Sequence, residues 1–243
     1  MILFVSDMHF SRRTHASERA LIACLEHYES TVERLYLVGD VFDEFIEYRR
    51  LIPKGCTRFL GLLSRWSDSG TPVTYLVGNH DPWHRDYFET ELGVRVVRDA
   101  LVEEASCRTL HIEHGDGIGP RANRPIRRLM RHPLPVWLYR SLLPGDLGMS
   151  LAELVNRRVE KNGPDPRTMQ ALTDYARHVL ASGPPDLVVM GHTHNAQLCT
   201  WADGVYLNTG AWYEHHTFGA LDTNGVHLLR WNGHLVETVA ECG

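Results

Sequence analysis

The 243-residue sequence lacks the features of a membrane-spanning, secreted or disulfide-stabilised protein. No apolar run approaches the roughly 18 residues that a membrane-spanning helix needs. The first residues show no basic stretch followed by a long apolar one, so we expect no secretory signal. The five cysteines are odd in number and lack Cys-x-x-Cys spacing. We therefore expect free thiols and a cytoplasmic protein.

The sequence also lacks a basic charge balance, a linker and an internal repeat. Its net charge is −5 with histidine neutral, which does not favour general nucleic-acid binding, so we expect no nucleic-acid partner. Proline, glycine and serine are scattered rather than gathered into a low-complexity segment. We predict a single domain over residues 1–243, with a helical cap inserted at about 117–183.

What the sequence does contain is a repeated pattern, in which an apolar stretch ends in polar residues able to bind metal. The stretches are residues 2–6, 34–38, 73–77, 110–113 and 187–190. They are followed in turn by Asp7 and His9, Asp40 and Asp43, Asn79, His80 and Asp81, His114 and Asp116, and His192 and His194. Ligands of open α/β sheets bind just outside the carboxyl ends of the strands. The pattern therefore predicts a metal centre and an enzyme.

Periodicity predicts an α/β fold with two packed sheets. Helical spacing at 16–25 and 56–66 alternates with strands, which is typical of parallel β-α-β units. Short strands and hairpin turns dominate 94–113 and 196–239. Within the inserted segment, residues 121–143 contain six arginines and no acidic residue, interleaved with leucine, methionine and tryptophan.

The candidate ligands suit divalent first-row metals. Carboxylate, imidazole and amide oxygen bind Mn²⁺, Fe²⁺ or Zn²⁺, and no thiolate is placed for a structural zinc site. Seven such residues exceed what one ion normally uses. A pair of ions about 3.5–4 Å apart, bridged by a carboxylate, would use them all.

Five blocks, in this order, resemble the signature of the calcineurin-like metallophosphoesterases. They are Asp7-x-His9, Gly39-Asp40-x-x-Asp43, Gly78-Asn79-His80-Asp81, His114-Gly115-Asp116 and Gly191-His192-Thr193-His194. The resemblance implies a four-layer α/β/β/α sandwich with two metal ions, Mn²⁺ foremost and Fe²⁺ or Zn²⁺ as alternatives. It implies that Asp7, His9 and His194 hold one ion and that Asn79, His114 and His192 hold the other. Asp40 would bridge both.

The resemblance also implies roles for residues outside the metal set. His80 would stabilise the phosphoryl group or protonate the leaving group, with Asp81 orienting its other ring nitrogen. Asp43 would hold a ligand histidine in place.

A narrower resemblance points to UDP-2,3-diacylglucosamine hydrolases of lipid A synthesis. It lies in residues 39–43, in the His114-Gly115-Asp116 block leading into a basic helical insertion, and in residues 210–212. It implies hydrolysis to UMP and 2,3-diacylglucosamine 1-phosphate, and peripheral association with the cytoplasmic face of the inner membrane. Arg124, Arg157 and Lys161 of the insertion are the candidates for binding this UDP-linked glycolipid.

Other functions stay open at this point. The best-known members of that class have arginine at the position of His80, whereas histidine is the general state of the superfamily. The alternative is a soluble phosphomonoesterase or phosphodiesterase acting on nucleotides or other small phosphoesters, which would need no lipid. A nuclease would show steep salt dependence. A binding module without catalysis would show no metal-dependent turnover.

Overall fold

The computed structural model describes residues 1–11, 14–120, 122, 124–159 and 165–242. One sheet contains, in order, β12 (Val236–Cys242), β11 (Gly225–Trp231), β10 (Thr217–Asp222), β1 (Ile2–Val5), β2 (Arg34–Val38), β3 (Val73–Leu76) and β4 (Arg95–Val97). The other contains β5 (Leu101–Ala105), β6 (Arg108–Ile112), β7 (Leu187–Met190), β9 (Gly204–Asn208) and β8 (Gln197–Trp201). The helices are α1 (His15–His27), α2 (Thr57–Asp68), α3 (Tyr87–Thr90), α4 (Arg124–Arg131), α5 (Pro133–Leu142), α6 (Gly145–Val159), α7 (Pro166–Ser182) and α8 (Trp212–His215).

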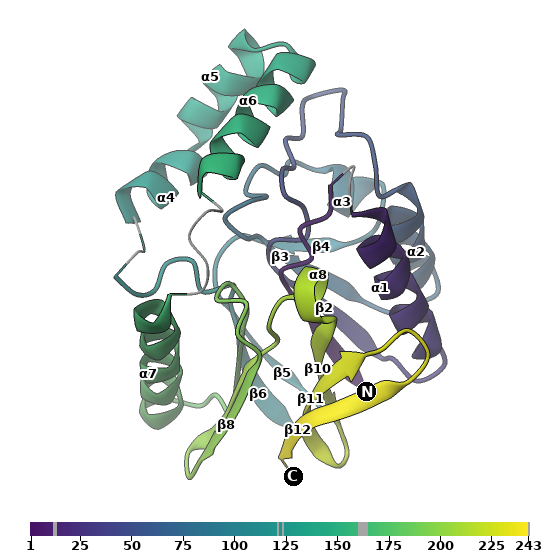
Figure 1. Ribbon diagram of the computed structural model, residues 1–243, viewed down its shortest axis with the longest axis vertical. Coiled ribbons are helices and arrows are strands. Elements are labelled where there is room, and N and C mark those ends of the chain that lie inside the picture. The colour runs from purple at the N-terminus through teal and green to yellow at the C-terminus, as the bar shows by residue number, and fades with distance from the viewer. Residues whose placement is uncertain (12–13, 121, 123, 160–164, 243) are drawn as a thin grey trace.

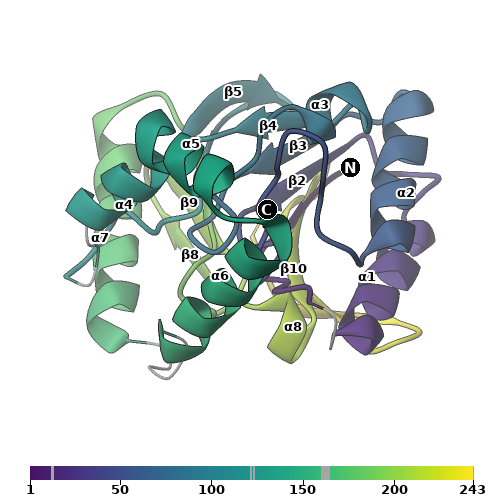
Figure 2. The same ribbon diagram turned by 90° about the horizontal axis from the view of Figure 1, so that it is seen from above.

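The two sheets pack face to face because their strands are apolar on both sides. In β1, Ile2 and Phe4 point into the core between the sheets, whereas Leu3 and Val5 face the core beneath α1 and α2. On the other sheet, Val188 packs against Leu172 of α7. Figure 2 shows the resulting layers, with α7 on one side, α1 and α2 on the other, and the sheets between them. The predicted α/β/β/α sandwich of mixed sheets is confirmed.

The helical segment expected as one insertion divides into two parts. Helix α7 covers the second sheet, whereas α4, α5 and α6 stand at one end of the sandwich (Figure 1). The α4–α6 group, called the cap below, is joined to the body by a small cluster in which Val136 packs with Ile46 and Trp83. Helix α5 begins at Pro133, and the side chain of His132 caps it by accepting from the Leu134 N–H at 3.2 Å.

The cap exposes many large apolar side chains. Its large side chains with at least two-fifths of their surface exposed are Leu129, Met130, Leu134, Trp137, Leu138, Leu142, Leu147, Leu151, Leu154 and Val155. Within the described residues, no helix is both long enough and apolar enough to cross a membrane. Large apolar side chains exposed in such number on one group of helices are typical of a place where a ligand, partner or lipid surface binds.

The parallel strands bring the predicted site together. Strands β1, β2 and β3 pair in parallel in the first sheet, as β6, β7 and β9 do in the second. Their carboxyl ends therefore lie at the same end of the sandwich, and the residues that follow them meet there.

His84 gives the fold a dependence on pH. It is buried among the rings of Phe45, Tyr75 and Phe88, and burial, with a smaller effect of Arg98 and Arg140, lowers its pKa from 6.5 to about 3. Only a weak contact with the Asp81 backbone opposes this shift. The unfolded chain binds a proton below about pH 6.5, and the folded chain does not until about pH 3, so acid favours unfolding.

We predict that His84→Phe reduces this loss of stability in acid. Between about pH 7.5 and 5, wild type should lose about 2 kcal/mol more of its free energy of unfolding than the variant. Urea unfolding in phosphate-free buffer at both pH values measures the difference. Equal losses in the two proteins would show that His84 is not held neutral.

Candidate metal centre

Seven predicted donors converge from both sheets at the strand ends. Six of them form two groups of three, and within each group the ligand atoms lie within 4.8 Å of one another: Asp7, His9 and His194 in the first, and Asp40, His114 and His192 in the second. The Asn79 Oδ1 atom lies 3.2 Å from His114 Nε2 and adds an amide oxygen to the second group. The structure thus brings together all seven residues predicted from the sequence.

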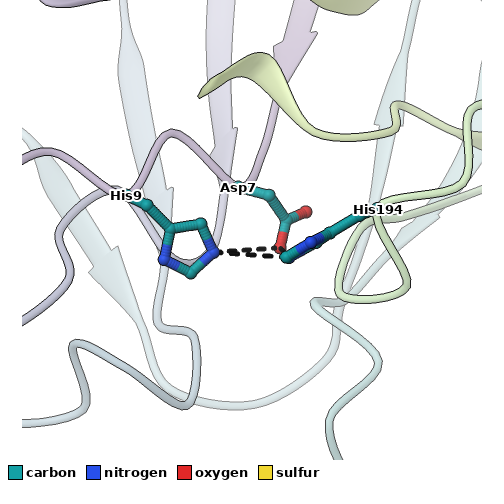
Figure 3. Close-up of side chains that lie close together, drawn as sticks. All are labelled: Asp7, His9 and His194. Carbon is teal, nitrogen blue, oxygen red and sulfur yellow. Dashed lines mark hydrogen bonds and ion pairs between the residues drawn. The ribbon is translucent and has the colours of Figure 1, made fainter. Parts of the chain in front are cut away.

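The two carboxylate oxygens of Asp7 have different surroundings: one accepts hydrogen bonds from neighbouring loops, and the other faces the site. Its Oδ2 accepts hydrogen bonds from the Ser6 hydroxyl and from the His192 N–H, the latter at 2.9 Å. Its Oδ1 is buried without a hydrogen-bond partner among the described residues and lies 3.3 Å from His194 Nε2 (Figure 3). A buried carboxylate oxygen with no donor is costly unless a cation faces it. This atom therefore supports a metal ion between Asp7, His9 and His194.

Asp40 lies between the two groups, and its two carboxylate oxygens also have different surroundings. Its Oδ1 accepts the His80 N–H at 2.9 Å. Its Oδ2 lies 3.3 Å from His114 Nε2 and 3.9 Å from His9 Nε2. One oxygen is thus held by the backbone, while the other faces a histidine of each group, as a bridging ligand requires.

Hydrogen bonds at the far ring nitrogens orient two of the histidines. The Nδ1 of His114 lies 2.9 Å from the Val38 carbonyl oxygen, to which it can only donate. The Nδ1 of His9 lies 3.2 Å from Asp43 Oδ1, so Asp43 holds His9 as predicted. Each contact leaves the Nε2 lone pair directed into the site, where a metal ion would use it.

Negative charge dominates the centre. Burial alone would lower the pKa of His9, but Asp43, Asp40 and Asp7 outweigh it and raise that pKa to about 9. For His114 the same balance, led among the carboxylates by Asp40, gives a pKa of about 10. Burial favours the neutral carboxyl of Asp40, yet the surrounding histidines hold its pKa well below the usual value. The centre therefore attracts cations, whether protons or metal ions.

Much of the ligand backbone is in a left-handed conformation that side chains seldom adopt. The residues concerned are Asp7, His9, Asp40, His192 and His194, with φ angles of 50°, 48°, 51°, 67° and 56°. Glycines make room around them. A Cβ on Gly39 would lie 2.3 Å from His114 Nδ1, and one on Gly78 would lie 2.0 Å from Asp40 Oδ1. Such conformations cost about 1–3 kcal/mol each and cluster at functional sites.

His80 lies beside the first group without belonging to the seven donors. Its ring is 4.7 Å from that of His9, centroid to centroid, and the two meet edge to face. Its Nδ1 is buried without a hydrogen-bond partner among the described residues. His80 also forms a possible ligand group with His9 and Asp43.

The predicted partnership between Asp81 and His80 is wrong. Asp81 is fully buried, and its carboxylate accepts from the N–H groups of Val41, Phe42 and Gly78 and from the Tyr75 hydroxyl. Both oxygens are therefore engaged by the loops after β2 and β3. Asp81 joins the two loops that carry Asp40 and Asn79, and within the described residues the His80 Nδ1 atom makes no hydrogen bond to it.

Asp116 attaches the cap to the metal centre. Its Oδ2 accepts from Arg127 Nε at 2.8 Å and from an Arg131 guanidinium nitrogen at 3.2 Å. The same guanidinium lies 3.3 Å from the Gly78 carbonyl oxygen. Sequence reasoning left Asp116 without a role, because its partners follow in a helix whose position the sequence does not give.

Other supporting residues were also missed. Ser6 and Asn208 hold loops of the site, the latter by donating to the Gly191 carbonyl at 2.8 Å. Tyr213 packs its ring against His9 and places its hydroxyl 3.4 Å from His194 Nδ1. Ser6 directly precedes Asp7 at the end of a strand, which is the only sequence signal that any of them carries.

The predicted substrate residues remain untested. The side chains of Arg124 and Arg157, and the whole of Lys161, lie outside the part of the chain that the structure describes.

The fold and the site together define the class of this protein: an α/β/β/α sandwich whose donors at the strand ends suit divalent metal ions. The profile of the calcineurin-like phosphoesterase family matches residues 1–196. The chain belongs to this family and is a phosphoester hydrolase. Membership implies divalent metal ions, and the donors described above fit them.

Curated relatives share a more specific name. The chain is 30% identical to a UDP-2,3-diacylglucosamine hydrolase of Porphyromonas gingivalis, over 91% of this chain and 94% of the relative. A protein of the same name from Edwardsiella ictaluri is 25% identical, over 97% and 93% of the two chains.

Solved structures support the fold alone. Yfce, a phosphoesterase from E. coli, matches with a TM-score of 0.51 and 16% identity, over 99% of this chain and 97% of that one. Zinc-bound Vps29 from Entamoeba histolytica matches with a TM-score of 0.52 and 13% identity, over 99% and 98%.

We predict that Asp81→Asn destabilises the protein. The amide would turn an N–H₂ group toward backbone N–H donors that now bind a carboxylate, which should lower the free energy of unfolding by about 2–3 kcal/mol. Urea unfolding of metal-free protein measures this loss. A variant as stable as wild type would show that the two loops do not depend on this carboxylate.

Proposed function

We propose that the protein hydrolyses UDP-2,3-diacylglucosamine to UMP and 2,3-diacylglucosamine 1-phosphate with two divalent metal ions, foremost Mn²⁺. The observation that carries the proposal is the joining of the metal centre to an apolar cap, through Asp116, Arg127 and Arg131. A diphosphate at the strand ends would thereby lie beside a surface suited to acyl chains. The names of the curated relatives support the same substrate.

The residues would divide between the two ions as their geometry suggests. Asp7, His9 and His194 would hold one ion, Asn79, His114 and His192 the other, and Asp40 both. When bound, such ions supply positive charge for the phosphoryl oxygens and make water more acidic. Asp43 and the Val38 carbonyl keep two imidazoles in the tautomer that this requires.

His80 would act on the substrate directly. Its Nδ1 has no hydrogen-bond partner among the described residues, and its ring packs edge to face against that of His9. As the attacking water oxygen bonds to phosphorus, the bond from phosphorus to the leaving phosphate oxygen breaks. His80 would stabilise the phosphoryl group or donate a proton to the leaving oxygen.

The cap would bind the lipid part of the substrate. Its exposed leucines and Trp137 could contact two acyl chains and the membrane that holds them, which would make the protein peripheral on the cytoplasmic face of the inner membrane. Arg124, Arg157 and Lys161 are proposed to bind the phosphorylated sugar by their charge.

His80 also favours a second candidate function. Histidine suits general phosphomonoester or phosphodiester hydrolysis, so a soluble nucleotide or small phosphoester could be the substrate instead. The two candidates share the metal centre and differ in whether the cap matters.

The deciding experiment is UMP release from UDP-2,3-diacylglucosamine by purified protein with added Mn²⁺, with chelator as the control. Bis-p-nitrophenyl phosphate and p-nitrophenyl phosphate serve as comparison substrates. Fast UMP release that depends on metal supports the lipid substrate. Turnover of the generic esters alone would overturn it and leave the second candidate.

We predict that Asp40→Ala abolishes both metal pairing and activity. Loss of the shared carboxylate should remove at least one ion per chain and lower turnover at least about 100-fold, since Asp40 Oδ2 faces a histidine of each group. Metal content after dialysis and turnover of bis-p-nitrophenyl phosphate measure the two effects. Asp68→Ala, an exposed position at the end of α2, is the matched control. Near-wild-type turnover with Mn²⁺ in Asp40→Ala would contradict the two-metal assignment.

We predict that Leu138→Ser combined with Leu142→Ser impairs only the lipid reaction. These leucines are 41% and 74% exposed, so their loss should cost little stability. The KM for UDP-2,3-diacylglucosamine in mixed micelles should rise roughly tenfold, because less apolar surface is buried on binding. Turnover of bis-p-nitrophenyl phosphate should not change. Leu235→Ser, at a leucine 67% exposed and remote in sequence from the cap, is the control. An unchanged KM would rule out a lipid-binding role for these leucines.

A further inference from the structure

A cavity of about 700 Å³ lies between the loop after β3 and helix α5 of the cap. Five arginines line it: Arg49, Arg85, Arg98, Arg131 and Arg140. His84 and one carboxylate, Asp86, line it as well. None of the seven metal donors is among its lining residues, although Val77, two residues before Asn79, is. The cavity is therefore a neighbour of the metal centre rather than a part of it.

At least two of the five arginines lack a carboxylate partner in the part of the chain that the structure describes, whereas Arg131 is paired with Asp116 and Asp99. Among the described residues, Arg98 and Arg140 have no carboxylate within ion-pair distance, and their hydrogen bonds go to carbonyl groups. A guanidinium nitrogen of Arg140 donates to the Trp83 carbonyl at 2.5 Å, while its Nε is buried without a partner. Burial and the neighbouring charge of Arg85 lower the pKa of Arg140 to about 10. Cations held together in this way favour binding of an anion.

Arg131 and His84 supply further hydrogen-bond donors to the lining of the cavity. Arg131 is anchored by Asp116 at 3.2 Å and by the Arg98 carbonyl at 2.6 Å, which fixes its guanidinium beside the cavity. His84 is 5% exposed, and neither ring nitrogen makes a hydrogen bond of good geometry within the described residues. A neutral imidazole N–H without an acceptor is a ready donor to an anionic oxygen.

We propose that this arginine-lined cavity is a second anion site, which binds a phosphoryl group separately from the metal centre. Several guanidinium groups lining one cavity suit the charge of a phosphate dianion, and Asp86 together with the Asp99 and Asp116 partners of Arg131 offsets only part of their charge. The source is either a soluble phosphate ligand or the headgroup of an anionic lipid. Trp137, 61% exposed, also lines the cavity and would meet a lipid surface. The proposal does not depend on which substrate the metal centre hydrolyses.

The site is tested by equilibrium dialysis of the metal-loaded protein with inorganic phosphate. Wild type should bind one more phosphate per chain than Arg98→Gln, in which the affinity of this site should fall at least tenfold. Arg98 is chosen because its hydrogen bonds to the His84 and Arg85 carbonyls are long, at 3.4 and 3.5 Å, so the fold should tolerate its loss. Arg98→Lys keeps the charge and should restore binding in part. Arg58→Gln, at an exposed arginine of α2, should bind as wild type.

Vesicles distinguish the two sources of phosphate. Sedimentation with phosphatidylcholine vesicles, with and without phosphatidic acid, is measured for wild type and Arg98→Gln. Binding that requires phosphatidic acid, needs Arg98 and is displaced by inorganic phosphate identifies a lipid headgroup. If the dialysis depends on Arg98 and the vesicles do not, the site takes a soluble phosphate. Both results support an anion site.

The proposal is overturned if folded Arg98→Gln and wild type bind phosphate with the same number and affinity. Turnover of bis-p-nitrophenyl phosphate should be unchanged in Arg98→Gln, since its hydrolysis needs only the metal centre. That readout separates failure of the anion site from failure of the proposed metal chemistry.

Discussion

Two buried carboxylates, Asp7 and Asp40, set the constraint on which the rest of the structure depends. Each gives one oxygen to a backbone N–H of a distant loop: Asp7 to the loop after β7, and Asp40 to the loop after β3. The same side chains that would hold cations therefore fix the loops that carry the other donors. The remaining oxygens face histidines, so their negative charge is balanced only when a proton or a metal ion lies between them.

The sandwich stabilises a site that is locally unfavourable. Five of the seven donor residues have left-handed backbones, and like charges lie close together. Such strain persists only where the surrounding structure over-determines it. Here the strands that end at the site are buried on both faces, as Ile2–Val5 and Leu187–Met190 are. Because Gly39 and Gly78 have no side chain, His114 and Asp40 can approach the backbone closely. Core packing thus offsets the cost of the site.

The parts that could be predicted are those whose cause is local in sequence. Asp7, Asp40 and His114 lie within two residues of the end of an apolar stretch, so both the strands and the candidate donors were evident from the sequence. Asp81 was assigned to His80 wrongly, because a neighbour in sequence is not a neighbour in space when a carboxylate is buried among loop N–H groups. The arginine-lined cavity could not be predicted either, since Arg49, Arg98 and Arg140 come from segments that only the fold brings together.

Arg131 of the cap contacts the loops of the metal centre through Asp116 and Gly78. Asp116 follows the donor His114 by two residues and binds Arg131, which also contacts the carbonyl of Gly78, the residue before Asn79. Arg131 therefore contacts the loops that carry two donors of the second group, His114 and Asn79. Helix α5 presents Leu142 outward and Arg140 toward the cavity, so apolar and anionic ligands would meet different faces of the same helix.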